Sequence, residues 1–202
     1  MSDSARAQAL LPYGSVETKG PGWWGVLTLI ATEACLFAYL LFGYAFTAIQ
    51  LGHSFLPAKP PSIHLAGPNT VILLASSVAA WWGERGIKRG ARGQLMLGVV
   101  VAIVLGILFV AIQLREWSSH KGGVAASGYN SHYFTITGFH MAHVVGGLIA
   151  LTLVLLWTAL GYFDNRRHLA VRAATVYWHF VDAVWLCVFS AFYLAPYLGA
   201  GQ

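Results

Sequence analysis

The 202 residues fit one domain, and their composition excludes an ordinary soluble fold. Hydrophobic residues make up 57% of the chain and charged residues only 9%, against about 25% charged in an average soluble domain. The net charge of +5 does not indicate nucleic-acid binding, because the Lys and Arg residues lie in connecting segments and form no basic stripe with interleaved aromatics. The composition therefore indicates a membrane protein that binds no nucleic acid.

Five apolar stretches are long enough to cross a membrane, which takes about 20 apolar residues. In chain order we expect helices over about 23–49, 66–84, 95–114, 133–160 and 175–198. The segment 1–22 is polar and lacks the pattern of a cleavable signal peptide. The sequence thus predicts an all-α fold: a polytopic membrane protein with one five-helix domain over 23–198 and a cytoplasmic tail over 1–22.

The Lys and Arg residues predict how the chain is oriented. The tail and the loops after the second and fourth helices share one side and hold most of the twelve basic residues. Cytoplasmic loops of membrane proteins are enriched in Lys and Arg. We therefore expect the N-terminus in the cytoplasm and the C-terminus on the periplasmic or outer side.

Glu33 interrupts the first predicted helix. It follows Trp24 by about nine residues, or roughly 14 Å along a helix, which is near the bilayer midplane. An ionisable group at that depth is costly and is a functional candidate. Two interpretations stay open: a neutral glutamate that only hydrogen-bonds inside the bundle, or a role in proton or oxygen handling or in tuning a neighbouring subunit.

Histidines on the later helices extend this polar set. His140 and His143 stand three residues apart on the fourth predicted helix, so they share a face. His143 is expected at the same depth as Glu33, and we predict a hydrogen bond between them. His179 and Asp182 fall in the first turns of the fifth predicted helix, where we expect structural polar roles. The histidines differ too much in depth to share one metal, so no metal or redox site is predicted.

Small and polar residues predict how the helices pack. Small residues recur every four positions on the fourth predicted helix, a pattern that lets another backbone approach closely: Gly138, Ala142, Gly146 and Ala150. Polar side chains near the second helix are expected to hydrogen-bond across helices: Asn69, Thr70, Ser76 and Ser77.

Two further groups of residues carry weaker signals. Gln113, Arg115 and Glu116 cluster where the third helix leaves the membrane, and there we expect an exposed, structural cluster at the level of the headgroups. Cys35 and Cys187 lie inside apolar segments, so we expect two buried packing residues and no disulfide.

Several motifs follow one another in a familiar order. They are T-E-A-C-L-F at 32–37, N-T at 69–70 with L-L-A-S-S at 73–77, Q-L-R-E-W at 113–117, G-F-H-M-A-H-V at 138–144 with Gly146, and Y-W-H-F-V-D at 177–182 with Trp185. Together they resemble the third to seventh helices of subunit III of the haem–copper respiratory oxidases. The resemblance covers residues 23 to 198 and lacks the first two helices of seven-helix members, as in five-helix bacterial forms.

The resemblance implies a helical bundle without haem or copper of its own. It implies binding to the catalytic subunit I, with subunit II and further respiratory-complex subunits beside it and the haem and copper in those partners. It also implies that a glutamate at the position of Glu33 lies in a cleft that holds phospholipid and is linked to oxygen access. We take Glu33, His143 and His140 as the candidate functional residues, and expect no catalytic residue in this chain.

The expected function is therefore that of a non-redox subunit III of an aerobic terminal oxidase of the cytochrome c oxidase type, in a bacterial inner membrane. It would support oxygen access, proton uptake and sustained turnover of a proton-pumping complex. Subunit III of a quinol oxidase and an accessory subunit of a nitric oxide reductase are alternatives. A stand-alone proton-coupled carrier and a membrane cytochrome belong to other classes. No inverted repeat supports the carrier.

Overall fold

The computed structural model describes residues 14–16, 19–55, 57, 63–119 and 123–197. Five long helices dominate this part of the chain: α2 (Pro21–Leu51), α3 (Ile63–Lys88), α4 (Arg92–Ser119), α5 (Gly128–Ala159) and α6 (Leu169–Phe189). A 3₁₀ turn, η1 (Gly52–Ser54), follows α2, and α6 continues through a π-helical turn, η2 (Ser190–Leu194), and a second 3₁₀ turn, η3 (Ala195–Tyr197). All five helices are long and apolar enough to cross a membrane, so the predicted all-α fold is confirmed.

The helices extend beyond the apolar stretches that predicted them. The second predicted helix, 66–84, is part of α3, and the fifth begins at Leu169 instead of 175. Hydropathy marks only the hydrocarbon part of a helix, whereas the backbone stays helical into the headgroup region. Residues 1–13 and 17–18 of the predicted tail lie outside the described residues. Pro21 already occupies the first turn of α2, where proline is favoured.

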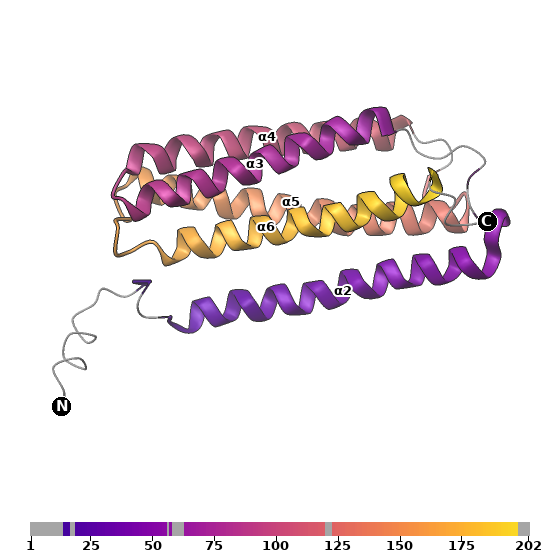
Figure 1. The fold of residues 1–202 in the computed structure, drawn as a ribbon, viewed down its shortest axis with the longest axis horizontal. Coiled ribbons are helices and arrows are strands. Elements are labelled where there is room, and N and C mark those ends of the chain that lie inside the picture. The colour runs from indigo at the N-terminus through magenta and orange to yellow at the C-terminus, as the bar shows by residue number, and fades with distance from the viewer. Residues whose placement is uncertain (1–13, 17–18, 56, 58–62, 120–122, 198–202) are drawn as a thin grey trace.

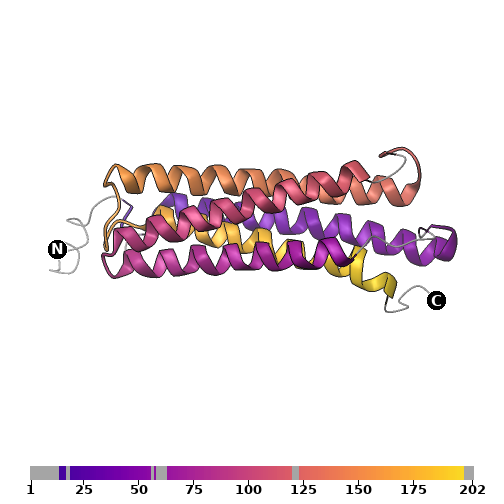
Figure 2. The ribbon, with the colours of Figure 1, turned by 90° about the horizontal axis from the view of Figure 1, so that it is seen from above.

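Consecutive long helices run antiparallel, with α2 at the edge of the bundle beside α6 (Figure 1). The start of α2, the α3–α4 turn around Arg89 and the α5–α6 loop around Arg166 lie at one end, which we call the basic end (Figure 1). Figure 2 shows α5 and α3 on opposite sides of the bundle. The predicted grouping of the basic segments is thus present. Which end faces the cytoplasm stays a prediction.

The closest backbone approach joins α3 to α4. A Cβ atom on Gly98 would lie 2.6 Å from the carbonyl oxygen of Ala79 and 2.8 Å from Cα of Gly83. The predicted close approach along α5 is wrong at Gly138 and Gly146. A Cβ atom added to either would have no backbone atom of another helix within 4 Å, and its nearest neighbours would be side chains at 3.9 and 3.6 Å. Small residues also form the contact between α3 and α4. The same small-residue pattern therefore occurs at a close helix contact on α3 and α4 and, on α5, at positions without one.

Hydrogen bonds across helices hold α6 against α3. The indole N–H of Trp178 donates to Ser76 at 3.0 Å, and that of Trp185 donates to Thr70 at 2.9 Å. His179 Nδ1 is hydrogen bonded to the Ser77 hydroxyl. With the bond from Asn69 Nδ2 to the Phe109 carbonyl oxygen at 3.4 Å, the predicted role of all four polar residues on this helix is confirmed.

The expected exposed cluster at the end of α4 is wrong for two of its three members. Gln113 and Glu116 are buried, and only Arg115 is exposed. The Tyr193 hydroxyl donates to Glu116 Oε1 at 2.7 Å and lies 3.0 Å from the Tyr133 hydroxyl. Positions three apart on a helix share a face, so Gln113 and Glu116 turn inward together while Arg115 turns outward.

Both cysteines are exposed, contrary to expectation. An apolar segment does not show which of its faces turns inward, because hydrocarbon accepts an apolar side chain as readily as the bundle interior does. Neither cysteine forms a disulfide.

The contact between α3 and α4 predicts a position-specific effect of alanine. Gly98→Ala should lower the free energy of unfolding in detergent by about 1–3 kcal/mol, because its methyl group would overlap backbone atoms of α3. Gly93→Ala is the control, since nothing lies within 4 Å of its added Cβ, and it should raise stability by about 0.5 kcal/mol. Equal effects of the two substitutions would contradict the close approach.

Candidate functional site

The predicted hydrogen bond between Glu33 and His143 is present. Glu33 Oε2 lies 3.0 Å from His143 Nε2, and it joins the middle of α2 to the middle of α5. The exposed fractions of the two side chains are 25% and 14%, so the pair is mostly enclosed. The depth argument located this contact because both residues lie about halfway along helices that run antiparallel.

The second ring nitrogen of His143 determines how the pair holds its proton. Nδ1 lies 2.7 Å from the carbonyl oxygen of Phe139, which can only accept, so Nδ1 carries a hydrogen. One further proton then lies between Nε2 and Glu33. Either a protonated carboxyl donates to the imidazole, or an imidazolium donates to the carboxylate. Both arrangements are neutral overall, which suits a site of low dielectric.

His140 lies next to the pair without joining it. Its ring is fully buried and packs at centroid distances of 5.0 Å from Trp185 and 6.0 Å from Phe109. Neither ring nitrogen has a hydrogen-bond partner among the described residues. The Phe37 ring contacts both His140 and His143 edge-on. His140 therefore packs in the interior of the bundle, beside the pair.

An apolar groove lies between this pair and the basic end. It has a volume of about 650 Å³ and is bounded by α2, α5 and α6, with Leu29, Gly146 and Tyr177 among its lining residues. Glu33 lies one helical turn beyond Leu29, and His143 lies three residues before Gly146. We call this space the α2–α5 groove. Small residues of the α5 stripe, Gly146 and Ala150, thus line an open space and make no close helix contact.

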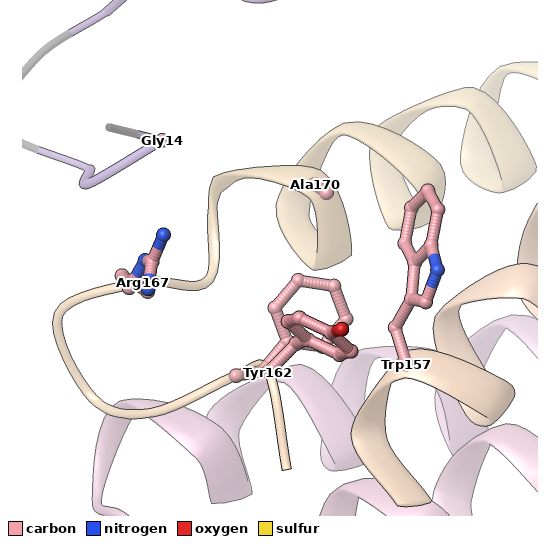
Figure 3. A pocket seen from close by; sticks show the side chains of 6 residues that line it. Gly14, Trp157, Tyr162, Arg167 and Ala170 are labelled. Carbon is pink, nitrogen blue, oxygen red and sulfur yellow. The ribbon is translucent and has the colours of Figure 1, made fainter. Parts of the chain in front are cut away.

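A smaller space at the basic end shares lining residues with the α2–α5 groove, and Figure 3 shows this smaller space. Trp157 and Ala170 line both spaces, and Tyr162 and Arg167 border the smaller one. Backbone N–H groups of Arg167 and Arg166 donate to Asp164 Oδ1 at 2.6 and 2.8 Å. These bonds fix the loop that carries Arg167 and hold the pKa of the Asp164 carboxyl below its usual value.

His179 and Asp182 lie deeper than predicted. Because α6 begins at Leu169, His179 is about 15 Å and Asp182 about 20 Å from that end at 1.5 Å per residue. They are therefore near the middle of the helix, and the expectation that they lie in its first turns is wrong. Asp182 lies beside Ser77, yet neither of its oxygens reaches hydrogen-bonding geometry with a described residue.

Among the described residues, no three His, Cys, Asp or Glu side chains come together in a group that could hold a metal ion. The arrangement can instead hold one proton between Glu33 and His143 and accommodate an apolar molecule beside them.

Comparison with known proteins gives the family. A sequence model described as "Cytochrome c oxidase subunit III" matches residues 15–197. The chain belongs to the cytochrome c oxidase subunit III family. Cytochrome c oxidase subunit 3 of Coturnix japonica is 33% identical over 177 residues, which cover 84% of this chain and 68% of the relative. That of Synechocystis is 33% identical over 178 residues, covering 84% of this chain and 74% of the relative.

Membership of the subunit III family makes this chain part of a multi-subunit respiratory oxidase. With its five membrane-length helices it is a multi-pass membrane protein. The resemblance seen in the sequence motifs is thus confirmed.

Sequence reasoning missed the aromatic residues that complete the site. Phe37 contacts the rings of both histidines, and Tyr177 lines the α2–α5 groove next to the stripe on α5. Phe37 follows Glu33 by four residues, a spacing that places it on the same helix face and that could have identified it. For Tyr177 the chain offers no such signal, because its place depends on how α6 packs against α5.

A double-mutant cycle measures the pair directly. Glu33→Ala and His143→Ala should show a coupling of about 0.5–2 kcal/mol in the free energy of unfolding, because each removes the partner of the other. Glu33→Ala combined with His140→Ala is the control, since these residues share no hydrogen bond. Additive effects for Glu33 and His143 would show that their contact contributes nothing to stability.

Proposed function

We propose that this chain is the non-redox subunit III of a cytochrome c oxidase, bound to the catalytic subunit I in a bacterial inner membrane. The observation that carries the proposal is the hydrogen-bonded Glu33–His143 pair beside an apolar groove. Subunit II and further respiratory subunits complete the assembly, and its haem and copper belong to those partners.

The α2–α5 groove supports a role in oxygen access. Oxygen is small and apolar, so it partitions into hydrocarbon and into apolar spaces in preference to water. The apolar lining of the groove suits an acyl chain, and Arg167 at the basic end suits a phospholipid phosphate. We infer that a bound phospholipid keeps the groove open to the membrane and closed to water.

The Glu33–His143 pair supports a role in sustained turnover and proton uptake. Its one proton can move between Oε2 and Nε2 without creating net charge inside the membrane. The surroundings of the pair therefore keep the same net charge whichever atom holds the proton. Loss of the pair would leave an unpaired polar group, open the groove to water and shorten the working life of the complex.

The relatives favour a cytochrome c oxidase over a quinol oxidase or a nitric oxide reductase, because the chains from Coturnix japonica and Synechocystis are cytochrome c oxidase subunits. Membership of a family of oxidase subunits also argues against a stand-alone carrier.

Turnover measurements test the role of Glu33. In the complete oxidase, Glu33→Ala should leave the initial rate of oxygen consumption close to that of the parent protein and shorten the time for which that rate is sustained. Glu33→Gln keeps a hydrogen-bonding side chain of the same length, so its progress curve should fall between the two. Progress curves that match the parent over many turnovers would contradict the proposal.

Purification tests the assembly. A tag on this chain should recover a larger haem-containing subunit after gentle detergent extraction, with a haem spectrum that disappears when the chain is separated from its partners. Recovery of the chain as a functional monomer, or a stoichiometric haem band from this chain alone, would overturn the proposal.

A further inference from the structure

A second groove lies on a different face of the bundle, between α3 and α6. Its volume is about 500 Å³, and we call it the α3–α6 groove. Leu74, Val78 and Trp81 of α3 form one wall, and Ala183 and Leu186 of α6 form the other. All five side chains are exposed. This groove shares no lining residue with the α2–α5 groove.

One carboxyl group belongs to this groove and has no partner among the described residues. Asp182 lines the groove, its exposed fraction is only 4%, and neither oxygen has a hydrogen bond from a described residue. His179, which also lines the groove, uses Nδ1 to bond Ser77. Buried polar groups in native proteins are almost always hydrogen bonded, so an acid left this way points to a donor from outside the chain.

The depth of Asp182 determines what kind of molecule can supply that donor. It lies about 20 Å from the start of α6 at 1.5 Å per residue, near the centre of a hydrocarbon layer about 30 Å thick. A lipid headgroup does not reach this depth, and an acyl chain carries no hydrogen-bond donor. A transmembrane protein helix brings both an apolar surface and a side-chain donor to the middle of a membrane.

We propose that the α3–α6 groove receives a transmembrane helix of the haem-containing oxidase subunit, which presents a hydrogen-bond donor to Asp182. This rests on the proposed function, because it assigns the contact face of the assembly proposed above. Ala183 and Ser77 are small and let the partner helix approach closely. Around them, Leu74, Val78 and Leu186 supply the apolar contacts that exclude lipid.

The partner's donor is a basic or an amide or hydroxyl side chain at mid-membrane depth. A basic side chain would pair with an ionised Asp182, and a neutral donor would bond the carboxyl oxygen. Polar side chains hydrogen-bond across membrane helices in this way. The contact selects its partner through the position of that donor along the helix, because apolar surface alone does not distinguish one helix from another or from lipid.

A matched pair of tryptophan substitutions tests this contact in the complete complex. Val78→Trp fills the groove, and Ile149→Trp places the same side chain on α5; the parent residues are 63% and 58% exposed, so neither change disturbs the interior of the bundle. Val78→Trp should reduce the haem-containing subunit recovered with this chain by about tenfold or more, and Ile149→Trp should leave it unchanged. Asp182→Ala should also reduce the recovery of the haem-containing subunit. Thermal unfolding of the isolated chain in detergent, measured for each variant, shows whether the variant still folds.

A photo-crosslinking amino acid at position 183 provides an independent readout in a chain whose core is unaltered. A covalent adduct with the haem-containing subunit is expected there, and none with that subunit from position 149. An adduct with lipid alone, or with a second copy of this chain, would overturn the proposal. So would equal recovery of the haem-containing subunit by the two tryptophan variants. If even the parent chain recovers no haem-containing subunit, the proposed function itself fails.

Discussion

The indole of Trp178 is the contact on which the arrangement of this bundle depends. It donates to Ser76 on α3, and its ring occupies a space left by two glycines, where a Cβ on Gly147 of α5 would lie 2.6 Å from it and one on Gly106 of α4 would lie 3.0 Å from it. One side chain of α6 therefore touches three other helices. Trp185, two turns further along, repeats the hydrogen bond to α3 through Thr70 and packs against His140. A membrane gives helices no hydrophobic drive toward one another, so such shape-matched and hydrogen-bonded contacts fix the rotation of α6.

That rotation determines the surroundings of Asp182, which is one of two acids near the middle of the helices. Glu33 meets His143 within the chain and forms a neutral pair, so its site is complete without a partner. Asp182 lines the α3–α6 groove. Ser77 is hydrogen bonded to His179, whereas neither oxygen of Asp182 has a hydrogen bond from a described residue. The chain itself thus supplies the hydrogen-bond partner of Glu33, and by our inference another subunit supplies the partner of Asp182.

Much of the fold followed from the sequence, because five apolar stretches and simple depth arithmetic depend on length alone. The Glu33–His143 contact and the hydrogen bonds of α3 were predicted correctly for that reason. The errors concern helix limits and helix faces. Asp182 was placed too near the membrane surface because α6 starts six residues before 175, in a segment that contains Arg172. Gln113, Glu116 and the cysteines were assigned to the wrong faces, since hydropathy does not distinguish an inward from a lipid-facing side.

The π-helical turn at Ser190–Leu194 has a consequence for the outer half of α6. In a regular helix, successive side chains point about 100° apart, yet Phe192 and Tyr193 are both fully buried. Phe192 packs against Tyr44 of α2, and Tyr193 bonds Glu116 of α4. The wider turn acts as a phase correction between two segments of one helix. The segment before Ser190 keeps the rotation that its hydrogen bonds to α3 require. The segment after Phe189 has a different rotation, which brings its side chains into contact with α2 and α4.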